Sequence, residues 1–192
     1  MIGFLSFMAF RRTATQSMQA VNSNQALFTY RQVKPIDTVL TRALLEGVLV
    51  VVVSIVVIAA AVFVGVDAVP DDPLAVMSVF VGMWLLAVGF ALTLSIVVEL
   101  AREIGKMVSF VMTPLYFISG VIFPIASVPP PYRDWVMLNP LAHGVEAARK
   151  AFAVHYHGAP ETSIAYIYAF ALVLLFLGLA LHRVFALKLV TR

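Results

Sequence analysis

A chain of 192 residues that is 62% hydrophobic and only 12% charged cannot hide its apolar surface in a water-soluble core, because soluble domains are roughly half apolar and a quarter charged. The composition excludes a soluble globular protein and predicts an integral membrane protein. The net charge of +3 comes from basic residues at the ends of apolar runs, which indicates membrane topology and no nucleic-acid partner. The absence of cysteine excludes disulfides and thiolate chemistry.

The chain begins with ten largely apolar residues, 1–10, followed by Arg11 and Arg12. A membrane-spanning helix needs about 20 residues. A signal peptide carries its basic residues before the apolar stretch rather than after it. We therefore expect residues 1–10 to be the cytoplasmic end of an incoming span, a remnant whose beginning is missing from the sequence.

Four uncharged runs are long enough to cross a bilayer, and each is expected to be helical because a chain in lipid must satisfy its own backbone hydrogen bonds. The predicted spans are 47–66, 74–98, 107–128 and 162–181. Pro114 lies inside the third run. It is either a kink that neighbouring helices tolerate or a flexing point beside a translocation path.

The basic residues are distributed unevenly between the two sides of these spans. Ten lie before the first full span, between the second and third, or after the last, and three lie in the other connections. The positive-inside rule therefore places the polar segment 11–42 and the C-terminus in the cytoplasm. Within that segment we expect a short helix from Thr15 to Leu27, and a second helix that starts at Lys34-Pro35 and runs into the first span.

Two carboxylates stand at the cytoplasmic ends of predicted spans. Glu46 precedes the first full span and Glu99 follows the second. We expect both to be solvated helix ends, with a salt bridge to a soluble partner subunit as the alternative. Because no ionisable residue lies inside the four runs, an ion-coupled carrier is disfavoured.

The external segment 129–161 is expected to hold short amphipathic helices that lie in or dip into the membrane surface. Three prolines end the third span, and Asn139-Pro140 is typical of a helix start. The apolar stripe of that helix is Leu141, Val145, Ala148 and Phe152, and His143 and Glu146 fall largely off it.

Motifs for self-contained chemistry are missing from the sequence. His155 and His157 have no further ligand beside them to complete a metal set, and there is no phosphate loop, nucleophile elbow or HExxH motif. We therefore expect no enzyme activity, no cofactor and no metal, and a protein that takes its energy from a partner.

Several stretches resemble the permease subunit of capsular polysaccharide ABC exporters, the KpsM-like branch of the ABC-2 transporters. They are NQALFTYRQVKPIDT at 24–38, RALLE at 42–46, PLYFISGVIFP at 114–124, and NPLAH at 139–143 followed by Val145-Glu146. The resemblance implies an all-α, polytopic membrane domain over 1–192, with four full spans, a partial N-terminal span and external re-entrant helices.

The resemblance also implies partners and site residues. The partners are an ABC ATPase subunit that hydrolyses ATP, a second permease copy, membrane lipid and a lipid-linked acidic polysaccharide moved from cytoplasm to periplasm across the bacterial inner membrane. The cytoplasmic segment around 17–30 would be the coupling helix that docks on the ATPase, and 129–152 the external gate helices. The coupling candidates are Asn24, Leu27, Phe28, Tyr30 and Arg31, and the candidates for the path or gate are Tyr116, Phe117, Tyr132, Trp135, His143 and Glu146.

Three alternatives remain at this point. The cargo could be another ABC-2 substrate, namely O-antigen, teichoic acid or a drug. The chain could be a truncated permease without activity, because family members have further helices before this point. It could also be a membrane enzyme acting on polyprenyl lipids, whose acidic cluster for Mg²⁺ would be Asp67, Asp71 and Asp72.

Overall fold

The computed structural model describes residues 1–29, 33–66, 68–101, 103–153 and 155–190, and these residues form helices and no strands. The all-α expectation is thus confirmed for the described part of the chain. The elements are α1 (Ile2–Met18), α2 (Ala20–Ser23), η1 (Gln25–Thr29), α3 (Pro35–Phe63), α4 (Pro73–Leu100), α5 (Glu103–Ile118), η2 (Ile125–Ser127), α6 (Tyr132–Val136), α7 (Pro140–Phe152) and α8 (Ile164–Val190).

Three of the described helices, α3, α4 and α8, are long and apolar enough to cross a membrane. They contain most or all of the predicted runs 47–66, 74–98 and 162–181. The predicted run 107–128 is not one continuous helix, because α5 ends at Ile118 after 16 residues. Gly120 then adopts a positive φ of 69°, a conformation that suits glycine, and Pro124 has no backbone N–H to continue a helix.

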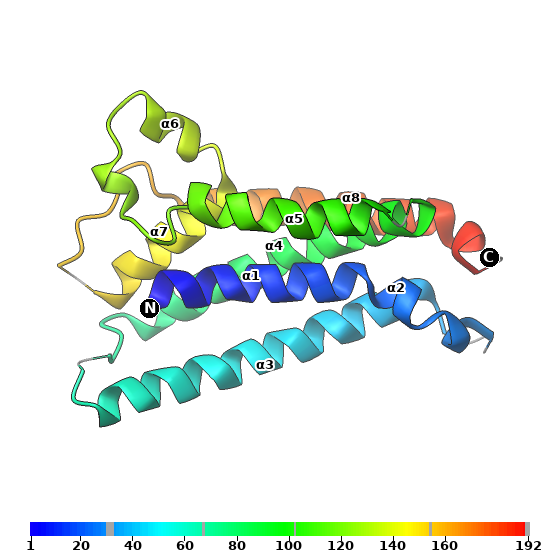
Figure 1. Cartoon of the computed structure of the whole chain (residues 1–192), viewed down its shortest axis with the longest axis horizontal. Helices are drawn as coiled ribbons and strands as arrows, with labels where there is room; N and C mark the ends of the chain where they lie inside the picture. The colour runs from blue at the N-terminus through cyan, green and yellow to red at the C-terminus, as the bar shows by residue number, and fades with distance from the viewer. Residues whose placement is uncertain (30–32, 67, 102, 154, 191–192) are drawn as a thin grey trace.

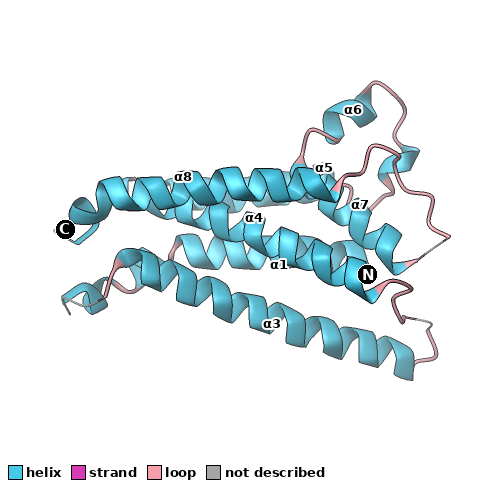
Figure 2. Cartoon of the chain, turned by 180° about the vertical axis from the view of Figure 1, so that it is seen from behind, coloured by secondary structure: helices cyan, strands magenta, loops and turns pink. Residues whose placement is uncertain are grey.

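The long helices lie side by side, and the shorter elements gather at the two ends (Figure 1). The N-terminus, α6, α7 and the start of α4 lie at one end, called here the outer end after the expectation that segment 129–161 is external. The segment α2–η1, the start of α3 and the end of α8 lie at the opposite end, called here the coupling end after the expectation that segment 17–30 docks on an ATPase. Seen from behind, the same arrangement is evident, with α3 along one edge of the bundle (Figure 2).

Helices α4 and α8 pack closely because glycines allow their backbones to approach. A Cβ added at Gly89 would lie 2.7 Å from the Leu175 nitrogen, and one at Gly178 would lie 2.6 Å from Leu92 Cβ. Small residues at such contacts are the usual device of helix packing in lipid. The pair is also joined by the Tyr168 hydroxyl, which donates to the carbonyl oxygen of Ser78 at 2.8 Å.

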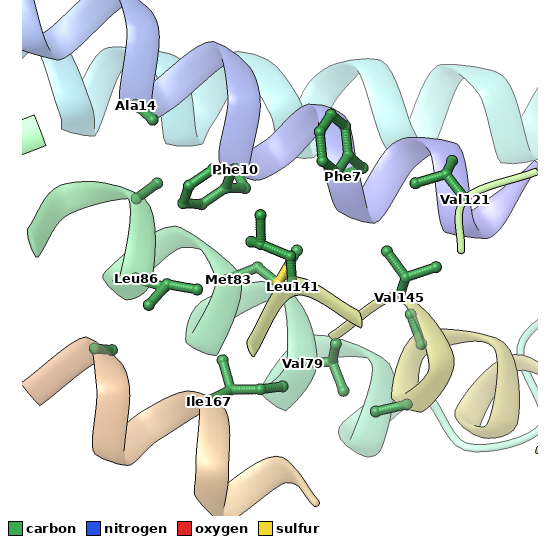
Figure 3. Packing of buried hydrophobic residues seen from close by; sticks show 14 of the residues in the cluster. Phe7, Phe10, Ala14, Val79, Met83, Leu86, Val121, Leu141, Val145 and Ile167 are labelled. Carbon is green, nitrogen blue, oxygen red and sulfur yellow. The ribbon is translucent and has the colours of Figure 1, made fainter. Parts of the chain in front are cut away.

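The main core lies where α1, α4, α7 and α8 meet (Figure 3). Phe7 of α1, Met83 of α4, Val145 of α7 and Ile167 of α8 are all fully buried there. Because α7 contributes to this core, it is an internal helix of the bundle over residues 141–148, and these eight residues are buried. The predicted apolar stripe of Leu141, Val145 and Ala148 is buried in this core, and His143 and Glu146, which were predicted to lie largely off the stripe, are buried as well.

Helix α3 differs from α4 in having most of its surface uncovered. Only 6% of its most apolar window is buried, compared with 61% for α4. It begins at Pro35, as the sequence predicted, and runs without interruption into the apolar run. Between α3 and α4 lies an open apolar groove of about 320 Å³, beside Gly47 and Trp84. The exposed face is suited to contact with acyl chains or with another membrane helix.

The polar segment before α3 is more broken than predicted. A single helix from Thr15 to Leu27 is wrong, since α1 continues to Met18 and is followed by the four-residue α2 and the 3₁₀ turn η1. Asn24 ends α2 by donating from its side-chain amide to the carbonyl oxygen of Ala20 at 2.8 Å. This local bond competes with helix continuation, as asparagine side chains commonly do.

Candidate functional site

The segment α2–η1 turns the chain between α1 and α3 at the coupling end. Phe28 is buried and packs with Met18, Val39 and Val88 in a second core cluster. It therefore anchors the segment to the bundle and offers little surface to a partner. Of the other coupling candidates, Asn24 is half-buried, and the side chain of Leu27 together with Tyr30 and Arg31 lies outside the described part of the chain.

A polar hollow of about 320 Å³ lies beside this segment. Residues of the α1–α2 junction, α2, η1, the end of α4 and the start of α5 line it, namely Gln19, Asn22, Ser23, Gln25, Val98, Gly105 and Lys106. Gln25 also donates to Glu99 Oε1 at 3.1 Å, which ties the segment to the end of α4. Glu99 is only 5% exposed, so the expectation of a solvated helix end is wrong for this residue.

Glu46 is likewise buried, with no exposed surface, and the expected solvated position is wrong here too. Arg42, one turn earlier on α3, lies 2.8 Å from Glu46 Oε1, and Arg12 of α1 lies 3.3 Å from Oε2. These contacts are ion pairs without hydrogen-bond geometry at either carboxylate oxygen. A carboxylate removed from water needs such partners, because an unpaired buried charge is costly. The cluster therefore holds α1 against α3.

At the outer end, α7 begins as the sequence predicted. Asn139 is the N-cap and accepts a hydrogen bond from the Leu141 backbone N–H at 3.0 Å, and Pro140 occupies the first turn. The Asn139 side chain also donates to the Ser119 hydroxyl at 2.9 Å. The start of α7 is thus joined to the connection that follows α5, which fixes the entry of this helix into the core.

Glu146 is the centre of a buried polar cluster on α7. Its Oε1 accepts hydrogen bonds from the Tyr156 hydroxyl and the Ala159 N–H, both at 3.0 Å, and its Oε2 lies 3.4 Å from Arg149 Nη1. Arg149 also donates to the carbonyl oxygens of Val121 and Phe123, at 2.6 and 3.0 Å. Burial, followed by the negative charge of Glu146, raises the pKa of Tyr156, so this phenol stays protonated and remains a donor.

His143 joins α7 to the loop before it and to the start of α8. The Ser163 N–H donates to Nδ1 at 3.0 Å, so this nitrogen carries no proton, and Nε2 then donates to the carbonyl oxygen of Met137 at 2.7 Å. Protonation of Nδ1 would break the bond from Ser163, so the two bonds can be made together only by the neutral imidazole. Burial lowers the pKa of His143, in agreement with that requirement.

The four aromatic candidates do not converge on one place. Tyr116 packs edge-on against Phe7 of α1, at 5.3 Å between ring centroids, and Phe117 is half exposed on the outside of α5. Tyr132 and Trp135 form an exposed edge-to-face pair on α6, with centroids 5.9 Å apart. The structure therefore brings His143 and Glu146 together on α7 and leaves Tyr132 and Trp135 apart from them, at the surface.

Sequence reasoning missed three of the interacting residues. Arg149 and Tyr156 complete the Glu146 cluster, and Arg12 completes the Glu46 cluster. Only the spacing of Glu146 and Arg149, three residues apart on a predicted helix, could have signalled a pair in advance. Within the described residues, no group of three or more histidine, aspartate or glutamate side chains comes together as a metal site.

Comparison with known proteins places the chain among transport proteins. The sequence profile described as ABC-2 type transporter matches residues 1–153. The polysialic acid transport protein KpsM of Escherichia coli is 36% identical over 181 residues, which cover 94% of this chain and 70% of KpsM. The capsule polysaccharide export inner-membrane protein CtrC of Neisseria meningitidis serogroup A is 32% identical over 93% of this chain and 67% of CtrC. The corresponding protein BexB of Haemophilus influenzae is 26% identical over 97% of this chain and 70% of BexB.

Proposed function

Because this chain belongs to the ABC-2 type transporter family, we propose that it is the membrane-spanning permease subunit of an ATP-driven exporter of capsular polysaccharide. The observation that carries the proposal is the 36% identity to a polysialic acid transport protein over 94% of the chain. The resemblance to KpsM-like permeases drawn from the sequence is confirmed by this relative and by CtrC. The cargo is a lipid-linked acidic polysaccharide, and its direction is from cytoplasm to periplasm.

The energy for export comes from a separate ABC ATPase subunit. The segment α2–η1 is its docking site, with the exposed side chains of Gln19 and Ser23 beside the polar hollow of the coupling end. A second copy of the permease completes the complex. The exposed apolar face of α3 and that of α5 are surfaces on which such a copy or lipid can pack.

In the membrane, the coupling end faces the cytoplasm together with the C-terminus. The uneven distribution of basic residues supports this orientation. Helices α3, α4 and α8 cross the bilayer, α5 with the residues after it provides a fourth crossing, and α6 and α7 enter from the outer side as gate helices. Their buried Glu146 cluster and the exposed pair Tyr132 and Trp135 then lie at the exit of the path.

The test is a deletion of this gene, with any paralogue, in an encapsulated host. Surface capsule is expected to disappear while polysaccharide accumulates inside the cell, and a plasmid copy should restore export. Normal capsule in the deletion strain would refute the proposal. Purification of the tagged chain from membranes, followed by identification of a bound ABC ATPase, tests the partner separately.

A further inference from the structure

Two arginines form a positively charged surface beside the buried carboxylate of Glu46. The side chains of Arg12 and Arg42 are 50% and 42% exposed, whereas Glu46 has no exposed surface. One negative charge thus stands between two positive charges, and the cluster keeps a net charge of +1. The positive part of the cluster is the part that reaches the surface.

Both guanidinium groups have N–H donors that their contacts within the protein leave unused. Arg12 contacts Glu46 through Nε, and Arg42 uses Nη2 both for Glu46 and for the side-chain oxygen of Gln16, at 3.0 Å. Within the described residues, the remaining nitrogens of these two side chains make no hydrogen bond or ion pair. Each guanidinium has five N–H donors in a planar fork that suits a carboxylate or phosphate. The pair can therefore bind a further anion with several oxygens.

The depth of the cluster along α3 indicates which anion it meets. The uncharged run of α3 begins at Gly47, immediately after Glu46, so the cluster lies where the hydrocarbon layer of a bilayer begins. Phospholipid headgroups occupy this level. The face of α3 that carries Arg42 continues through Leu49, Val53 and Val56, at i+7, i+11 and i+14, and these side chains are 39%, 45% and 61% exposed. Charge and apolar stripe follow one another as headgroup and acyl chain do in a lipid.

We propose that Arg12 and Arg42 bind the headgroup phosphate of an anionic bilayer phospholipid, whose acyl chain lies along the exposed stripe of α3. Basic sites between membrane helices commonly bind anionic lipid headgroups. The net charge of +1 favours a lipid without its own cationic group over a zwitterionic one. This lipid is a component of the bilayer and not the exported cargo, so the inference does not depend on what the permease moves.

The test measures retained lipid on the full chain. The protein is inserted into nanodiscs of phosphatidylcholine with a minority of phosphatidylglycerol and released into mild detergent, and the bound lipids are counted by native mass spectrometry. Glu46→Gln removes the competing carboxylate and should raise retention of phosphatidylglycerol. The triple variant Arg12→Gln, Arg42→Gln, Glu46→Gln leaves no buried charge behind and should lower retention about five-fold or more, at the usual strength of each basic residue near a membrane.

A matched control is Arg183→Gln, which removes an exposed arginine of α8 near the same end of the molecule and should leave retention unchanged. The single variant Glu46→Gln should raise retention and the triple variant should lower it. Because the two effects are opposite, the test remains decisive even if one variant folds poorly. Equal retention of both lipids, unchanged retention in the triple variant, or no rise with Glu46→Gln would overturn the proposal. Displacement of the lipid by soluble glycerol phosphate alone would also overturn it, because the site would then recognise free phosphate.

Discussion

Replacement of Glu146 by glutamine is expected to destabilise the outer end of the protein strongly. The amide oxygen can still accept from Tyr156 and Ala159, but the amide nitrogen would face Arg149 Nη1, and the arginine would lose its counter-charge. Removing one partner of a buried ion pair typically costs about 3–5 kcal/mol. The Arg149 side chain is 15% exposed and keeps its two carbonyl acceptors, so we expect the lower end of that range.

For a chain of this size, about 3 kcal/mol corresponds to a fall of about 6–12 °C in the unfolding midpoint. Thermal unfolding in detergent, followed by tryptophan fluorescence, measures it. Glu161→Gln is the matched control, because Glu161 pairs with Arg133 at 3.1 Å but its side chain is 40% exposed. An exposed pair contributes about 0–1 kcal/mol, so this control should shift the midpoint only slightly. Equal shifts for the two variants would refute the view that burial of Glu146 decides the cost.

Three further predictions concern other parts of the molecule. Gly89→Leu should separate α4 from α8 and lower thermal stability by more than about 1–3 kcal/mol, because even a methyl group would lie 2.7 Å from a backbone nitrogen of α8; an unchanged midpoint would contradict the close contact. Because burial lowers the pKa of His143, the unfolded chain binds a proton that the folded chain excludes at mildly acidic pH. The free energy of unfolding should therefore not change with pH above about pH 6.5 and should fall as the pH drops below it. In His143→Gln the free energy of unfolding should depend less steeply on pH in that range. Ser23→Trp, at an exposed position on α2, should reduce co-purification of the ATPase without changing the midpoint, whereas Phe28→Ala should lower the midpoint itself, since Phe28 is buried.

Local signals in the sequence predicted the elements better than the contacts between them. Asn139-Pro140 and Pro35 marked real helix starts, because capping and the fixed φ of proline act over a few residues. The apolar runs predicted α3, α4 and α8, because lipid imposes helical structure on any long apolar segment. By contrast, Glu46 and Glu99 stand at the ends of apolar runs, and their burial depends on Arg12 and Gln25, which belong to other elements.

The apolar stripe of α7 predicted only part of what is buried on this helix, for a similar reason. The pattern of an apolar stripe assumes that one face of a helix packs on protein and that the opposite face is exposed to water. Helix α7 is covered by α1, α4 and α8, and its polar residues are buried because Glu146 has partners in Arg149, Tyr156 and the backbone of Ala159. A buried polar group with full hydrogen bonding cannot be told from an exposed one by its position in a heptad. The partners come from segments whose approach only the fold determines.

Helix α1 connects the two ends of the molecule. At the coupling end it continues directly into α2, and midway along its length Arg12 pairs with Glu46 of α3. At the outer end its first turn packs on α7, where a Cβ on Gly3 would lie only 3.0 Å from Arg149 Nη2. An α-helix transmits displacement along its axis because each turn is hydrogen-bonded to the next. Helix α1 is therefore an element that contacts both the segment α2–η1 at its end and, through Gly3, the Arg149 side chain of the Glu146 cluster.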